Sequence, residues 1–469
     1  MNSTRTPVTG IMIGAGNRGV DAYGLYALEK PHRLKMIAVA EPIPEKRKRY
    51  QSLHNIPDSH AYTNWEDILN PTVGKIADVV FICTQDDKHF FPTKMAIELG
   101  YHILLEKPIS PHLAECQELV KLRTEKDQYI QVGHVLRYTE FWKSIKNVVD
   151  SGRIGRIIHY DHSENVSFWH FGHSFVRGNW KNKATSSPLI LAKSCHDLDL
   201  MFWLIGKQPL NVQSTGNLSH YRPENAPENA ADRCTDGCSH ASTCPWYAPS
   251  LYLRGKPIIQ EIFTSSNKFL KFLAKIVLKH RKLAGHLFKL APKYKSFLDW
   301  KDWPSSIITT DLTVEGRMKA LREGPYGKCI YKTGNDVVDH QVSTFNFPSG
   351  VTGTLTVHGL SDIEGREIRI FGTKGSIRGV FRAEHEEVVV TNFSDSIPIT
   401  VYKTGMNMAG HGGGDFGMMD AFTSVLLGVK SPEKAGYADI ETAMESHFMA
   451  FAAEEARITQ ETIKMNLYR

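Results

Sequence analysis

A glycine-rich turn near the N-terminus limits what this chain can fold into more than any other feature. The β-branched run Val8–Ile13 leads directly into Gly14-Ala15-Gly16-Asn17-Arg18-Gly19, and a helical period follows. In a strand–turn–helix unit the first glycine permits a tight turn, the second lets the backbone approach a pyrophosphate, and the third allows close helix–strand packing. The free N–H groups at the helix N-terminus attract phosphates. We therefore predict a dinucleotide site that uses Gly14, Gly16, Asn17, Arg18 and Gly19.

An acidic residue follows the second expected strand. The run Leu34–Ala40 is typical of a strand, and Glu41 comes next, 22 residues after Gly19. A carboxylate in this place accepts hydrogen bonds from ribose hydroxyls and repels a 2′-phosphate. Glu41 thus favours NAD as the cofactor, while Lys46 and Arg47 close behind it leave NADP as an alternative.

The first 135 residues alternate short β-branched runs with helical periods, which is the pattern of a parallel sheet covered by helices. Further strands are expected at Asp78–Cys83, His102–Leu105 and Tyr129–Val132. The interpretation is an α/β fold class with an NAD(P)-binding Rossmann domain over residues 1–135.

Residues 136–469 follow a different order. Helix Glu140–Asp150 leads to an alternating strand at Gly155–Asn165, and strands recur at hairpin spacing between residues 338 and 401. Helices near Phe416–Leu427 and Ile440–Arg457 end the chain. We predict a C-terminal α+β domain with a large, mostly antiparallel sheet for substrate binding and oligomerisation, with an insert at about 220–300.

Composition narrows the class of protein. The chain has 469 residues, of which 41% are hydrophobic and 23% charged, as in ordinary soluble globular proteins. No apolar run of about 18 residues is present, so we expect no transmembrane segment. The N-terminus lacks the pattern of a signal peptide. A net charge of +6 is too mild over this length to argue for a nucleic-acid partner. The expected location is cytoplasmic.

Two further segments end strands of the expected parallel sheet. One is Cys83–His89, with Thr84 and His89, and the other is Glu106-Lys107-Pro108. Ligands of open α/β sheets bind outside the carboxyl ends of the strands, so both segments point at the cofactor crevice. We predict that Thr84, His89, Glu106 and Lys107 bind the cofactor. A lysine facing the nicotinamide can also bind a substrate hydroxyl and shift its proton.

These motifs together resemble the glucose–fructose oxidoreductase/inositol dehydrogenase (Gfo/Idh/MocA) family. The resemblance adds Val132-Gly133-His134 with Arg137, Gly152–Gly155 and Phe371–Gly375 to the motifs above. It implies an NAD-dependent enzyme that exchanges hydride with a sugar or polyol carbon, and a homo-oligomer built on the large sheet. In this resemblance Lys107 corresponds to the catalytic lysine of the family, and His196 to its catalytic histidine.

A histidine is chemically suited to that role. Hydride leaves a carbinol carbon only as the hydroxyl loses its proton, and a group that titrates near neutrality can take it. The chain departs from the resemblance at Ala192, where many family members have an aspartate four residues before the histidine. Lys193, Asp197 or Asp199 could replace that aspartate in part, or the aspartates point into the helix–sheet packing.

A segment dense in aromatic residues precedes this motif. Residues 168–180 contain His173, Arg177 and Trp180, which we predict to contact a carbohydrate, because sugar sites combine flat apolar faces with planar donors. The alternative is a loop packed by its own aromatics. The segment His411–Asp415, before a helix, is a further candidate for the edge of the pocket.

Three cysteines are crowded into one short loop. Cys234, Cys238 and Cys244 are predicted to hold a structural Zn²⁺, since thiolates in a reducing compartment suit a tetrahedral metal. Cys195, Cys329 or His240 would supply the fourth ligand. The alternatives are buried thiols, or one disulfide with a spare thiol.

One stretch, residues 267–294, carries eight basic residues and no acidic residue, with interleaved apolar side chains. It is either a basic amphipathic helix for a membrane surface or partner, or a solvated helix that lays its lysines over the domain.

Three functions are compatible with these observations. The first is an NAD-dependent oxidoreductase acting on a sugar or glycoside. The second is a redox-neutral, NAD-dependent glycoside hydrolase that uses transient oxidation and elimination. The third is a non-enzymatic NAD-binding regulator, against which the retention of Lys107 and His196 argues.

Overall fold

The structure is a computed structural model that describes residues 6–264, 267–290, 292–405, 407 and 410–469. Six parallel strands form the first sheet, in the order β3-β2-β1-β4-β5-β6. Their bounds are β1 Val8–Ile13, β2 Leu34–Ala40, β3 Ala61–Tyr62, β4 Val79–Ile82, β5 His102–Leu105 and β6 Ile130–Val132. The predicted Rossmann fold is confirmed.

Helices flank this sheet because its strands are apolar on both faces. All four residues of β4 are buried, and β1 is nearly as closed. The helices that follow the strands are α1 Leu25–Glu29, continuous with a π-helical turn at Arg18–Gly24, then α2 Pro44–His54, α3 Phe90–Glu98 and α4 Leu113–Thr124. The carboxyl ends of β1, β4 and β5 therefore lie side by side at one edge, below the glycine turn.

The second sheet has nine strands in the order β14-β13-β12-β11-β7-β10-β9-β8-β15. Among the described strands of this sheet, only β7 and β10 are parallel neighbours, so the predicted mostly antiparallel sheet is confirmed. The strands are β7 Ile157–Ser167, β8 Asn211–Asn217, β9 His340–Asn346, β10 Thr352–Ser361, β11 Gly365–Gly372, β12 Gly375–Arg382, β13 His385–Asn392, β14 Pro398–Thr404 and β15 Ile463–Lys464.

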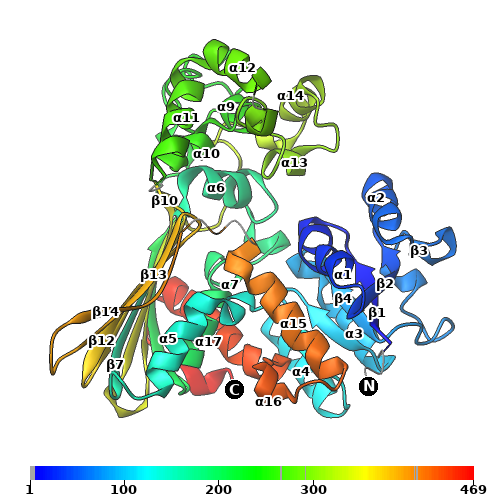
Figure 1. Ribbon diagram of the computed structural model, residues 1–469, viewed down its shortest axis with the longest axis vertical. Helices are drawn as coiled ribbons and strands as arrows, with labels where there is room; N and C mark the ends of the chain where they lie inside the picture. The colour runs from blue at the N-terminus through cyan, green and yellow to red at the C-terminus, as the bar shows by residue number, and fades with distance from the viewer. Residues whose placement is uncertain (1–5, 265–266, 291, 406, 408–409) are drawn as a thin grey trace.

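Helices lie between the two sheets (Figure 1). They are α5 Glu140–Asp150, α7 Leu189–Ala192, α8 Cys195–Ile205, α15 Gly414–Leu426, α16 Pro432–Ala435 and α17 Ile440–Thr459. Met418 and Phe422 of α15, like Ile440 and Met444 of α17, are buried in the cores of the Rossmann domain. The last part of the chain thus completes the first domain as well as the second.

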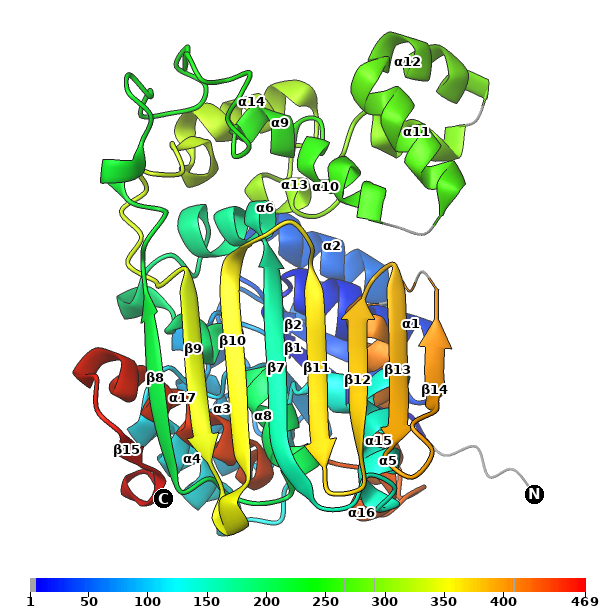
Figure 2. The same ribbon diagram turned by 90° about the vertical axis from the view of Figure 1, so that its left-hand side faces the viewer.

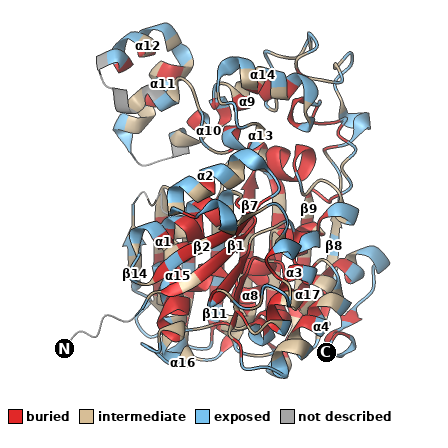
Figure 3. Cartoon of the chain, turned by 90° about the vertical axis from the view of Figure 1, so that its right-hand side faces the viewer, coloured by how far each residue is buried: buried red, intermediate tan, exposed pale blue. Residues whose placement is uncertain are grey.

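The insert sits at one end of the second sheet. The face of this sheet that points away from the helices is turned to the viewer in Figure 2 and is not covered by any described helix. The insert and its approach contain α6 Phe168–Phe171, α9 Ala248–Tyr252, α10 Lys256–Glu261, α11 Lys268–Lys279, α12 Arg281–Leu290, α13 Ser305–Ile308 and α14 Val314–Glu323. Figure 3 shows the buried residues gathered in the strands and inner helices. Within the described ranges, no helix is long and apolar enough to cross a membrane.

Candidate functional site

The glycine turn is shaped for a close ligand. Gly14 adopts φ +90°, and a Cβ there would lie 2.7 Å from the Cys83 carbonyl oxygen. A Cβ on Gly19 would collide with the Gly14 carbonyl, so this position also requires glycine. Gly16 faces open space, because a Cβ on it would meet no heavy atom of the described residues within 4 Å. A pyrophosphate can therefore approach the backbone at Gly16.

Glu41 closes the other side of this turn. Its two carboxylate oxygens accept hydrogen bonds from the N–H groups of Ala15 (2.8 Å) and Ile43 (3.0 Å). The guanidinium of Arg47 donates to the Glu41 carbonyl, so this cation is held behind the strand end. The carboxylate, which is buried, thus lies beside the glycine turn, where a ribose would bind.

Arg18 joins the turn to both the first and the second domain. Its guanidinium pairs with Glu106 (Nε–Oε1 2.6 Å) and with Asp415 at the start of α15 (2.9 Å). His411 Nδ1 lies 3.1 Å from the same Asp415 carboxylate. Burial alone would raise the pKa of Asp415, but His411 and Arg18 hold it well below its usual range. The segment proposed as a pocket edge thus reaches the cofactor side of the site.

Lys107 points across to the second domain. Its ammonium donates to the carbonyl of Ala192, at 2.9 Å, just before the helix that carries His196. The two residues, 89 positions apart in the sequence, are therefore brought to one place.

His196 is buried and neutral. Only 6% of it is exposed, and its Nδ1 has no hydrogen-bond partner among the described residues. Its ring centre lies 5.6 Å from that of His134 and 6.2 Å from that of His411. Burial, followed by the positive charge of Lys107, lowers the pKa of His196 well below its usual value. A neutral imidazole with a free nitrogen can accept a proton.

The acidic residues near His196 are engaged elsewhere. Asp199 forms a bidentate pair with Arg137, at 2.6 Å for each bond. Asp197 accepts from Arg366 at 2.6 Å and lies 3.2 Å from His162. The aspartates therefore point into the helix–sheet packing and do not replace the carboxylate missing at Ala192.

Lys193 is part of the same buried charge cluster. Its ammonium lies 3.1 Å from Glu164 of β7, and Glu164 also pairs with Arg366 at 2.8 Å. Burial lowers the pKa of Lys193, but the carboxylates of Glu164 and Glu364 together outweigh burial and raise it, so the lysine stays charged. Sequence reasoning did not single out Glu164 or Arg366. The available signal was the inward-facing side of β7, which carries Tyr160, His162 and Glu164 where apolar residues are expected.

Two further histidines position the turn after Lys107. His89 Nδ1 lies 2.6 Å from the Pro108 carbonyl oxygen, and its other nitrogen 3.2 Å from the Thr84 carbonyl. His447 of α17 accepts a hydrogen bond from the Ile109 N–H at 2.9 Å. His89 and Thr84, predicted as cofactor residues, thus connect the ends of β4 and β5, while His447 was not anticipated.

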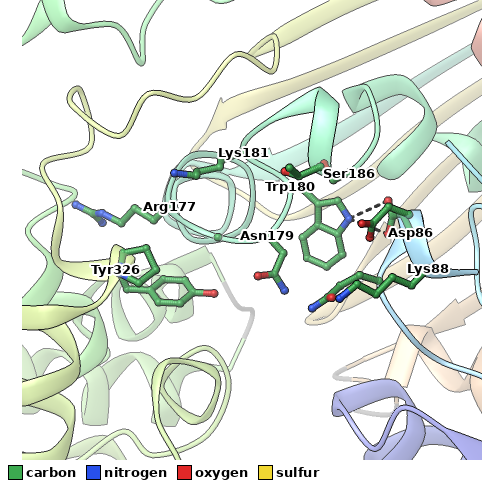
Figure 4. A pocket seen from close by; sticks show the side chains of 13 residues that line it. Asp86, Lys88, Arg177, Asn179, Trp180, Lys181, Ser186 and Tyr326 are labelled. Carbon is green, nitrogen blue, oxygen red and sulfur yellow. Dashed lines mark hydrogen bonds between the residues drawn. The ribbon is translucent and has the colours of Figure 1, made fainter. Parts of the chain in front are cut away.

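A cavity of about 380 Å³ lies between the domains, lined by residues 85–88 on one side and by residues 177–181 and Tyr326 on the other. Figure 4 shows Asn179, Lys88 and the ring of Trp180 around it. The Trp180 indole N–H donates to Asp86 at 3.1 Å. Burial raises the pKa of Cys195 to about 12. Among the described residues, the lining of this cavity includes neither Lys107 nor His196.

The other two predicted substrate residues are packed into the protein. The ring of His173 stacks on Tyr326 at 5.0 Å, and its Nδ1 lies 3.0 Å from the Tyr252 hydroxyl. The Arg177 guanidinium donates to the carbonyls of Lys328 and Trp246, both at 2.9 Å, and is turned away from the cavity in Figure 4. Arg177 and Trp180 both line the cavity, whereas His173 is not among its lining residues.

The structure does not support the predicted zinc site. Cys234, Cys238 and Cys244 line a small apolar cavity together with Cys329, but all are free thiols. Across the described part of the chain, no three His, Cys, Asp or Glu side chains are grouped to hold a metal ion. Burial raises the pKa of Cys244 and Cys329, which favours the thiol over the thiolate that a metal needs. Arg177 donates to the Cys234 sulfur at 3.6 Å, so this thiol already has a polar partner.

Both domains match known family models. Residues 9–134 match the model described as oxidoreductase family, NAD-binding Rossmann fold, and residues 146–238 match the C-terminal alpha/beta domain of the same oxidoreductase family, GFO_IDH_MocA. The inositol 2-dehydrogenase of Corynebacterium glutamicum is 25% identical, and the uncharacterized oxidoreductase YrbE of Bacillus subtilis is 28% identical. Each alignment covers 45% of this chain and 58% of the relative, so the chain spans little more than half the length of these relatives.

Solved structures share the fold over nearly the whole chain. The oxidoreductase of Agrobacterium radiobacter in complex with NAD⁺, L-tartaric acid and magnesium has a TM-score of 0.63 at 13% identity, covering 99% of this chain and 100% of that one. The aldose–aldose oxidoreductase of Caulobacter crescentus, complexed with glycerol, has a TM-score of 0.61 at 13% identity, covering 98% and 99%. At this identity the likeness shows the fold.

The stability of the protein should fall in mild acid because of His447. Burial lowers the pKa of His447 to about 3, and its Nδ1 donates to the Ala443 carbonyl while Nε2 accepts from Ile109. The unfolded chain binds a proton below about pH 6.5, so the stabilisation is complete above that pH and declines as pH falls towards 3. Between pH 7.5 and 5.5 this one group should cost about 1.4 kcal/mol.

Urea unfolding at the two pH values measures this loss. His447→Gln, which can still accept from Ile109 but does not titrate, should show a smaller loss than the wild type. His32→Gln, at an exposed site, serves as the control and should behave as the wild type. An unchanged pH dependence in His447→Gln would contradict the assignment.

Proposed function

Because the chain belongs to the Gfo/Idh/MocA oxidoreductase family, we propose that it is an NAD-dependent oxidoreductase that moves hydride between nicotinamide and a carbinol carbon of a sugar or glycoside. The observation that carries this proposal is the buried, neutral His196, with an unpartnered nitrogen among the described residues, beside Lys107 at the carboxyl edge of the Rossmann sheet. Such a group is suited to take the proton that a carbinol must lose as its hydride leaves.

The residues of the first domain fit a dinucleotide. The backbone N–H groups at Gly16, Asn17 and Gly19 would hold the pyrophosphate, since Gly16 faces open space. Glu41 would accept from the ribose hydroxyls. Glu106 and Lys107 end β5 and would lie on the nicotinamide side. When bound, NAD supplies the hydride acceptor.

Residues of both domains would orient the substrate and handle its proton. Lys107 would donate a hydrogen bond to the reacting hydroxyl, which stabilises the developing alkoxide, and His196 would receive the proton. The cavity beside Trp180 and Asp86 provides the room for the remainder of a sugar. The open face of the nine-stranded sheet is the surface we propose for a homo-oligomer.

Lys107→Ala and His196→Ala should each lower kcat by about 10²–10⁴, the usual contribution of a positioned acid–base group. Binding of NADH, followed by calorimetry, should stay within a fewfold of the wild type, because the glycine turn and Glu41 are untouched. Lys126→Ala and His32→Ala, both at exposed positions, are matched controls and should leave turnover unchanged. Turnover within a fewfold of the wild type in either site variant would refute the proposed roles.

The protein should bind NAD(H) more tightly than NADP(H), because the Glu41 carboxylate, which lies beside the glycine turn, would repel a 2′-phosphate on a ribose bound there. Calorimetry with both cofactors measures the ratio. Glu41→Ala should weaken NAD(H) binding by about tenfold, the equivalent of about 1.4 kcal/mol for a lost charged hydrogen bond. The affinities for NAD(H) and NADP(H) should then lie closer together. Glu45→Ala, on the exposed side of α2, is the control. A wild-type preference for NADP(H) would show that Lys46 and Arg47 set the choice.

The substrate should be a glycoside or modified sugar rather than a free polyol. The carboxylate that accompanies the catalytic histidine in many relatives is replaced by Ala192, and Asp197 and Asp199 are paired elsewhere. A panel of free sugars, inositol and aryl glycosides, with NADH absorbance and released aglycone followed together, tests this. NADH that rises with product marks a dehydrogenase, whereas aglycone release that needs NAD without NADH accumulation marks the redox-neutral hydrolase. If inositol is the only compound of the panel that is oxidised, the predicted preference for glycosides is wrong.

A further inference from the structure

Helices α11 and α12 form a unit that projects from the end of the molecule. In Figures 1 and 2 the pair stands beyond α10, clear of both sheets. Its small apolar core is made by Leu273, Ala274, Val277, Ala284 and Phe288, together with Ile259 of α10. The inner faces of the two helices are therefore packed in this core, and their outer faces are exposed.

The outer faces carry a charge of one sign. Residues 267–294 contain eight of the 56 basic residues of the chain and none of its 50 acidic residues, so the rest of the chain is close to electrical balance. The exposed cations of the two helices are Lys268, Lys275, Lys279, Lys282 and Lys289. A solvated helix of an ordinary domain usually mixes both signs, whereas this surface concentrates positive charge.

Large apolar side chains stand among these cations. Phe269 is 53% exposed, Phe272 58% and Leu283 52%. On a helix of 3.6 residues per turn, Lys268, Phe272, Lys275 and Lys279 share one side of α11. The ring of Phe272 is thus exposed on the same side of α11 as three lysines, which the solvated-helix interpretation does not explain.

We propose that the outer face of α11 and α12 docks on an anionic lipid bilayer. Ammonium groups at this spacing attract lipid phosphates, and clusters of four to eight basic residues on an amphipathic helix are typical of binding to anionic leaflets. Phe269, Phe272 and Leu283 would enter the boundary between headgroups and acyl chains, as apolar residues of interfacial helices do. Exposed phenylalanine and leucine together favour a bilayer over a nucleic-acid backbone, which is contacted by cations and polar groups.

This docking does not depend on the proposed reaction. The surface belongs to a helix pair of the insert that stands clear of both sheets in Figures 1 and 2, whereas Glu41 and Lys107 follow strands β2 and β5 of the first sheet and His196 lies in α8. Variants of the surface should therefore keep oxidoreductase turnover, so the two proposals fail or succeed separately.

Flotation of the full-length protein with vesicles tests the proposal. We expect at least tenfold stronger partitioning at 0.1 M NaCl to phosphatidylcholine vesicles that contain about 30% phosphatidylglycerol than to pure phosphatidylcholine vesicles, and a loss of binding as salt is raised, because screening weakens surface attraction. Lys268→Gln/Lys275→Gln/Lys279→Gln should weaken partitioning more than about tenfold. Phe269→Ser/Phe272→Ser should weaken it severalfold at unchanged charge.

The matched control removes the same charge elsewhere. Lys121→Gln/Lys126→Gln/Lys430→Gln, all at exposed positions, should bind vesicles as the wild type does. Circular dichroism and thermal melting confirm that each variant is folded. The proposal is overturned if the folded wild type ignores anionic vesicles, if it binds neutral vesicles equally, or if the control loses binding to the same extent. Binding to a single-stranded oligonucleotide or self-association through this surface, without vesicle binding, would likewise overturn it.

Discussion

The hydrogen bond from the Ile109 N–H to the His447 imidazole fixes the turn on which Lys107 sits. It joins the end of β5 to α17, and α17 packs on both domains. A buried N–H left unpaired costs about 1–3 kcal/mol. Breaking this hydrogen bond is therefore unfavourable, and the distance between the two domains is kept fixed. The Lys107 ammonium can then reach the Ala192 carbonyl, which precedes the helix of His196. A site assembled from two domains depends on this spacing.

The proximity of Lys107 to His196 also determines the protonation state of His196. His196 is buried, and Lys107 is its main charged neighbour, so both effects disfavour the imidazolium. The carboxylates that would favour it are turned away, towards Arg137 and Arg366. Pairing of those aspartates with arginines is required for their own burial, and it leaves the histidine neutral. The pairing of the buried aspartates and the neutral state of His196 thus arise from one set of contacts.

Local patterns were sufficient to predict much of the fold. Strands such as Leu34–Ala40, and helix Glu140–Asp150, were predicted with the bounds that the structure has, because their apolar periods are strong. Partners distant in the sequence were not predictable: Asp197 meets Arg366, 169 residues later. The cysteine loop shows the same limit, since spacing suggested a metal but the buried thiols and the Arg177 contact are three-dimensional properties. Glycine-turn chemistry is local and could be predicted, whereas the orientation of Arg177 could not.

The neutral state of His196 has a consequence for the reaction. A proton accepted there creates an imidazolium in a buried place, next to the Lys107 cation, while the nearby Asp199 carboxylate is already paired with Arg137. Such a charge is unfavourable, so the proton must leave quickly or return to the substrate within the same cycle. A simple dehydrogenase has to release one proton to solvent in each turnover, whereas a cycle that oxidises and then reduces the sugar returns it. The electrostatics of the site therefore favour chemistry in which His196 takes a proton and gives it back, and this is the physical reason to test glycoside hydrolysis alongside oxidation.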